Sequence, residues 1–119
     1  MDPRIETVIT VIGNNIGDDL VLAQMAQLAS LPSSRLRHMF KNELGTTPNR
    51  YRHSLRMKRA RELLETKFLS VKEVATLVGV HGESRFVQEF KRAYGLTPGL
   101  YRNSLNARSG RRRTPASAR

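Results

Sequence analysis

The chain contains an internal repeat. Residues 25–31 (MAQLASL) recur 49 positions later as VATLVGV, and residues 35–55 recur 50 positions later as residues 85–105. The change of offset places one extra residue of the second copy near residues 81–83, in a predicted turn where chain length varies at little cost. Identical pairs fix this register: Ala26/Ala75, Leu28/Leu77, Arg35/Arg85, Phe40/Phe90, Lys41/Lys91, Gly45/Gly95, Thr47/Thr97, Pro48/Pro98, Tyr51/Tyr101, Arg52/Arg102, Ser54/Ser104 and Leu55/Leu105. Two copies of one helical unit in a basic chain indicate a protein that grips a long periodic polymer at two places.

Length and charge narrow the class of protein. With 119 residues and 39% hydrophobic content, the chain can bury one modest core or two small ones, which disfavours a multidomain enzyme. Its net charge is +11, but residues 1–34 hold one basic and four acidic side chains. Residues 35–119 therefore carry twenty basic and six acidic side chains, a net +14. The positive field is localised in the repeated part.

Absences in the sequence point to a reducing compartment. Without cysteine the chain has no disulfide, no thiolate chemistry and no cysteine metal site. No apolar run approaches the roughly 20 residues of a membrane span, and the N-terminus lacks the basic and apolar regions of a signal peptide. We expect a cytoplasmic, nucleoid-associated protein with no membrane partner and no cofactor.

The helix signals predict an all-α chain without a convincing strand. Gly45 and Gly95 supply left-handed stops, Thr47-Pro48 and Thr97-Pro98 open the helices that follow, and Ser70 with Glu73 forms a capping box. The matching Val21 with Gln24 has lost the capping hydroxyl. Seven helices are predicted, at about 3–14, 22–29, 33–44, 48–66, 71–79, 83–94 and 98–105.

Each copy is predicted to fold as a helix, a tight turn and a second helix. In copy one Met25, Ala26 and Leu28 should face Leu36, Met39, Phe40 and Leu44, and in copy two Val74, Ala75 and Leu77 should face Phe86, Phe90 and Tyr94. The small Ala26 and Ala75 allow the close crossing of a helix-turn-helix. On the helix over 48–66 we also expect a core face of Tyr51, Leu55, Ala60, Leu63 and Leu64.

The second helix of each copy presents an outward face that suits DNA. Arginine can fork onto guanine, glutamine can pair with adenine and valine can touch a thymine methyl, whereas lysines and hydroxyls near helix ends suit phosphates. The predicted base contacts are Ser34, Arg37, His38, Ser84, Arg85, Val87 and Gln88. The predicted phosphate contacts are Ser33, Lys41, Thr47, Arg50, Lys91, Thr97 and Arg102.

Plainer interpretations stay open beside these. His38 is as well explained by simple solvation, and Arg56 by an internal ion pair. His53 and His81 have no ligand partner at metal-binding spacing. Arg111–Arg113 are either a nonspecific phosphate anchor or a solubilising end. A dense basic set, which could be a solvated face but favours phosphate binding, consists of Arg35, Arg37, Lys41, Arg50, Arg52, Arg56, Lys58, Arg59 and Arg61.

The segments FKNELGTTPNRYR and ESRFVQEFKRAYGLTPGLYR, joined by LRMKRARELLETKFLSVKEVATLVGV, resemble the AraC/XylS-type DNA-binding domain of bacterial transcription regulators. The resemblance covers about Leu20–Leu105 and departs from the family pattern at Val21, Val80 and Gln88. It implies two helix-turn-helix (homeodomain-like) subdomains whose second helices enter successive major grooves. The predicted helix over 48–66 would be about 28 Å long, comparable with the roughly 34 Å between grooves on one DNA face.

These observations predict the domain organisation. An AraC-type DNA-binding domain should span 1–106, with a first module at about 5–46, a linker helix at 48–66 and a second module at 69–105. Residues 107–119 are polar and basic, which predicts a disordered tail.

The expected function is sequence-specific binding of double-stranded DNA by a bacterial transcription regulator. Because the copies run in the same chain direction, we expect a monomer on one asymmetric site; a fragment of a dimeric regulator is the alternative. Activation, with RNA polymerase as second partner, is the working expectation, although the residues do not exclude repression. The rival is a nonspecific nucleoid-type or RNA-binding protein. An enzyme is not expected, because no nucleophile, base or metal set converges.

Overall fold

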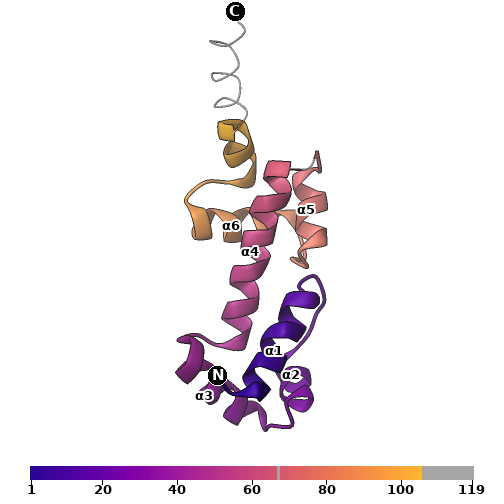
Figure 1. Ribbon diagram of the computed structural model, residues 1–119. Coiled ribbons are helices and arrows are strands. Elements are labelled where there is room, and N and C mark those ends of the chain that lie inside the picture. Colours follow the sequence, from indigo (N-terminus) through magenta and orange to yellow (C-terminus); the bar gives the residue numbers. More distant parts are fainter. Residues whose placement is uncertain (67, 106–119) are drawn as a thin grey trace, which may run out of the picture. The chain divides into compact units, whose positions relative to one another are not determined.

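The computed structural model describes residues 1–66 and 68–105, and within them every regular element is a helix. These are α1 (Pro3–Asn14), α2 (Leu22–Leu28), α3 (Ser33–Leu44), α4 (Pro48–Thr66), α5 (Val71–Leu77), α6 (Glu83–Tyr94) and a last helical segment over residues 98–105 (Figure 1). The predicted all-α class is confirmed, and the helix bounds differ from the predicted ones by at most two residues. The chain divides between Lys58 and Arg59, inside α4, into two compact units.

The first unit is built on the mutual packing of α1, α2 and α3. Phe40 of α3 is fully buried, and the ring of Tyr51 from α4 meets it edge-on, with centroids 5.5 Å apart. Burial of each such large apolar side chain contributes about 1.5–3 kcal/mol. The core side chains come from all three helices and the turn after α2: Ile5, Val8, Ile12, Met25, Ala26, Ala29, Leu36 and Phe40.

The second unit has an aromatic centre. The ring of Phe90 lies 5.9 Å from Phe86, 4.9 Å from Tyr94 and 5.7 Å from Tyr101, measured between centroids. The Tyr101 hydroxyl donates to the carboxylate of Glu65 on α4, which ties the last helix to α4. Burial and this carboxylate raise the pKa of Tyr101 to about 12. Other buried apolar side chains of the second unit are those of Ala60, Leu63, Leu64, Val74, Ala75, Val78 and Val80.

Local capping explains where the helices begin and end. Ser70 accepts from the backbone N–H of Glu73 at 3.0 Å, and the Glu73 carboxylate accepts from the Ser70 N–H at 2.9 Å, so the predicted capping box is confirmed. In copy one only half of it exists, because Gln24 accepts from the Val21 N–H at 2.9 Å and valine has no hydroxyl to reciprocate. Gly45 ends α3 in the predicted left-handed conformation, with φ of 74°.

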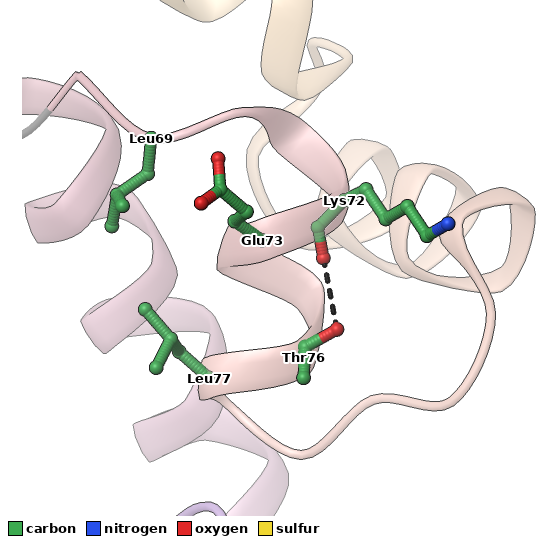
Figure 2. A pocket seen from close by; sticks show the side chains of 5 residues that line it. All are labelled: Leu69, Lys72, Glu73, Thr76 and Leu77. Atoms are coloured by element: carbon green, nitrogen blue, oxygen red, sulfur yellow. Dashed lines mark hydrogen bonds between the residues drawn. The ribbon is translucent and has the colours of Figure 1, made fainter.

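Two leucines predicted to be core are not buried. Leu28 and Leu77, the paired residues of the repeat, are each 54% exposed. At 3.6 residues per turn, Leu28 lies roughly 100° around α2 from the centre of its buried face, formed by Met25, Ala26 and Ala29. Leu77 instead borders a hollow of about 400 Å³ on α5, opposite Leu69 (Figure 2). The periodicity misassigned these leucines because α2 and α5 are two-turn helices with narrow buried faces.

The helices are too polar or too short to be membrane spans. Among residues 1–66 and 68–105, no helix combines the length and apolar character needed to cross a bilayer.

Candidate nucleic-acid interface

The exposed face of α3 gathers the base-contact residues predicted for copy one. Leu36 and Phe40 are buried in the core, so the side chains on the opposite side of α3 are turned to solvent. Ser34, Arg37, His38 and Lys41 are all exposed and together line a hollow of about 460 Å³. The structure therefore brings these four residues together on one surface, which we call the α3 face.

Asn42 also belongs to the α3 face, and sequence reasoning missed it. Its amide Nδ2 lies 3.3 Å from Nε2 of His38, one helical turn away. The spacing of four residues from His38 could have identified it. When the amide donates to Nε2, the other ring nitrogen of a neutral His38 carries the proton and is a donor. In that arrangement the contact with Asn42 determines which ring nitrogen of His38 is the donor.

The start of α4 adds two predicted phosphate-binding residues. The Thr47 hydroxyl accepts from the backbone N–H of Arg50 at 3.2 Å, so Thr47 is the N-cap that the sequence predicts. That hydrogen bond uses an acceptor lone pair and leaves the hydroxyl hydrogen for a phosphate oxygen. Arg50 is exposed beside it, whereas Ser33, at the first residue of α3, is partly buried. Backbone N–H groups at a helix start favour anions as well.

On α6 the outward residues predicted for copy two are again at the surface. Ser84, Arg85, Gln88 and Lys91 are exposed, and Val87 is partly buried. Arg85 is held by an ion pair with Glu89, in which Nε donates to Oε2 at 2.7 Å. Sequence reasoning missed Glu89, although its spacing of four from Arg85 is the signal for such a pair.

The start of the last helix repeats the arrangement at the start of α4. Thr97 accepts from the backbone N–H of Leu100 at 3.2 Å. Arg102 is partly buried. Its repeat counterpart Arg52 donates to the backbone carbonyl of Leu20, which is a structural contact. The assignment of Arg102 to a phosphate stays a prediction.

The dense basic set separates into structural and surface members. Arg56 donates from Nε to the carbonyl of Ile16 and from Nη2 to that of Asp18, both at 2.8 Å, so these two contacts are internal; the ion pair suggested by the sequence stays a prediction. Arg61 lies over the ring of Tyr94, 4.9 Å from its centroid, and 3.8 Å from the Glu65 carboxylate. The exposed members of the first unit that form no such contacts within residues 1–66 are Arg35, Arg37, Lys41, Arg50 and Lys58.

In the part of the chain that the structure describes, no three histidine or acidic side chains lie close enough to hold an ion. The tail residues Arg111–Arg113 fall outside the described residues. In each unit, the second helix of a helix-turn-helix carries basic, hydroxyl and amide groups at the surface. This arrangement defines the class of helix-turn-helix proteins.

Comparison with known proteins identifies the family. A family model described as a helix-turn-helix domain matches residues 25–104. The transcriptional regulator GadX of Escherichia coli O6:H1 is 35% identical over 88 residues, and the regulator GbdR of Pseudomonas aeruginosa is 29% identical over 77 residues. The solved DNA-binding domain of AdpA, in complex with a target DNA, is 27% identical with a TM-score of 0.84, covering 91% of this chain and 96% of that one. The chain belongs to the AraC-type helix-turn-helix family.

The matched regulators are much longer than the matched region. The alignments cover 73% and 65% of this chain but 32% of GadX and 21% of GbdR. The chain thus corresponds to about a third or less of these relatives.

Proposed function

We propose that this chain is a sequence-specific double-stranded DNA-binding transcription regulator that inserts α3 and α6 into major grooves of one duplex. The observation that carries the proposal is the α3 face, where Arg37 and His38 are exposed beside Lys41. Arginine and histidine can discriminate base edges, while lysine at the end of the same helix suits a phosphate. Family membership and the DNA-bound AdpA domain support the same function.

Each unit has its own set of proposed contacts. Base edges would be read by Ser34, Arg37 and His38 in the first unit and by Ser84, Arg85, Val87 and Gln88 in the second. Phosphates would be held by Ser33, Lys41, Thr47 and Arg50 in the first and by Lys91, Thr97 and Arg102 in the second. Residues 1–106 would act as one DNA-binding domain, with residues 107–119 as a basic tail.

The repeat sets the form of the proposed DNA site. Both copies lie in one chain, in the same sequence order, and are covalently joined through α4. A monomer should bind one asymmetric site of two half-sites, about one helical turn apart. We propose that the protein acts in the cytoplasm on the nucleoid, with RNA polymerase as a second partner when it activates.

Selection from a random duplex library, followed by competition with random DNA at moderate salt, tests the proposal. A preferred asymmetric site is expected. On that site Arg37→Ala should lose about 1–3 kcal/mol of binding free energy and relax the base preference at one position. Lys72→Ala removes a cation from the hollow on α5 and serves as the matched control, with a small effect equal on all sequences. Absence of a preferred site would indicate a nonspecific nucleic-acid-binding protein.

A further inference from the structure

The ion pair between Arg85 and Glu89 on α6 has unequal exposure. The side chain of Arg85 is 68% exposed, whereas that of Glu89 is 16% exposed. The carboxylate is thus mostly covered, whereas the guanidinium is mostly in solvent. It nevertheless holds the guanidinium through Nε, with a distance of 2.7 Å. Glu89 thus contacts an exposed side chain from a mostly covered position.

The atom that Glu89 binds matters for what Arg85 can do. A guanidinium has five N–H donors in one plane, and the hydrogen bond from Nε leaves the four on the terminal nitrogens. Two of these, in parallel, are what guanine O6 and N7 accept in the major groove. A carboxylate on Nε fixes the plane of the fork and reduces the side-chain freedom that binding would otherwise remove. The contact therefore prepares Arg85 for bidentate recognition.

Stabilisation of α6 is a weak explanation for the pair. Arg85 lies in the first turn, where the helix dipole disfavours a positive charge. An acidic residue placed after its basic partner is also the less stabilising order for a spacing of four. The helix already has an acidic residue, Glu83, in its first turn.

The repeat provides an internal comparison. Arg85 corresponds to Arg35, but the position of Glu89 is occupied by Met39 in copy one. Met39 packs against the core of the first unit. A long apolar side chain therefore satisfies the fold at this position, and packing does not require a carboxylate. Within residues 1–66, Arg35 forms no ion pair. The buttressed arginine is a property of the second copy alone.

We propose that Glu89 is a positioning residue that presents Arg85 to a guanine in the half-site bound by α6. This inference rests on the proposed DNA-binding function. It assigns a base identity to one position and makes that position depend on two residues. The half-site bound by α3 should contain no position that depends on Arg35 to the same degree.

Dissociation constants for the selected duplex and its single-base variants test the pair. Arg85→Ala should abolish a preference for guanine of roughly five- to hundredfold at one position. Glu89→Met, which installs the residue found in copy one, should weaken that preference at least about threefold and leave random-duplex binding equal or tighter, since a negative charge is removed. Glu89→Gln retains an acceptor for Nε and should restore most of the preference.

The variants separate the possible failures. In the Arg85→Ala background, Glu89→Met should have no further effect on the base profile, because the two act as one unit. An unchanged base profile for Glu89→Met, or a loss of affinity equal on all sequences, would overturn the inference while the proposed function stands. The inference would also fail, and the proposed function stand, if Arg85→Ala removed discrimination at a position where the wild type prefers a base other than guanine. A wild-type chain with no preferred site would overturn both. Circular dichroism of each variant confirms that it is folded.

Discussion

Arg56 is assigned a structural role, in contrast to the cations proposed to contact DNA. Its replacement by methionine tests this assignment. The side chain projects from α4 toward the segment after α1, where its guanidinium donates to the carbonyls of Ile16 and Asp18. Methionine has a similar stem and cannot donate. Arg56→Met should therefore destabilise the first unit without removing a DNA contact.

The expected loss of stability follows from the two hydrogen bonds. Each is 2.8 Å long and has a charged donor. Such bonds contribute about 1.5–3 kcal/mol each. The carbonyl of Asp18 belongs to an exposed residue and regains water when the guanidinium leaves, which reduces its share. We expect the free energy of unfolding to fall by about 2 kcal/mol, within the usual range for a destabilising point mutation.

Urea titration followed by circular dichroism measures this loss, with Lys58→Met as the control. Lys58 is exposed on the same helix and forms no contact of this kind with residues 1–66, so its replacement should change stability by less than about 0.5 kcal/mol. The slope of log K against log salt for DNA binding should be the same for Arg56→Met and wild type.

Two results would refute this reasoning. Equal unfolding free energies for Arg56→Met and Lys58→Met would mean that the hydrogen bonds to the two carbonyls contribute nothing. A fall in the salt slope of about 0.9 in Arg56→Met would mean that Arg56 binds a phosphate after all.

Four further predictions concern the glycines, the Ser70 cap, the pKa of Asp2 and the tail. Gly45→Ala should destabilise the protein by about 1–2 kcal/mol because Gly45 has a φ of 74°. Gly13→Ala should stabilise it by about 0.5–1 kcal/mol, because Gly13 lies in a helix with open space where an added Cβ would lie. Melting temperatures that shift in the same direction for both variants would contradict this. Ser70→Ala should lower the free energy of unfolding by about 1 kcal/mol in urea titration. Arg4 lowers the pKa of Asp2 to about 2, so the stability of the folded protein should fall as the pH drops from 3.8 to about 2, and Asp2→Ala should remove this pH dependence. Deleting Arg111–Arg113 should weaken binding to all duplexes alike and reduce the salt slope by up to about 0.9 for each phosphate that the tail neutralises; an unchanged slope would exclude these residues from the interface.

Helix positions were predictable from the sequence because their signals are local. Gly45 ends α3 in the left-handed conformation, and Thr47 caps α4 through the backbone N–H of Arg50. Both effects involve only residues a few positions away in the sequence. Burial was less predictable, since it depends on the width of the face that neighbouring helices cover. Leu28 and Leu77 have the right spacing but lie beyond that width.

The candidate site was predictable to the level of helix faces. Spacing alone placed Arg37, His38 and Lys41 on one surface, because a helix face is fixed by residue number. The partners of these side chains were only partly predictable, since a spacing of four marks Asn42 and Glu89 as candidates but rotamers and competing acceptors decide whether a contact forms. The structure supplies the contacts of Asn42 with His38 and of Glu89 with Arg85.

In the proposed function, each copy of the repeat reads its own stretch of one DNA site. Base-preference profiles of the selected duplex, measured for wild type, Arg37→Ala and Gln88→Ala, test it most directly. We expect one asymmetric site in which the two variants flatten the base preference at different stretches, about one helical turn apart. A palindromic site, or two variants that flatten the same stretch or none, would contradict it.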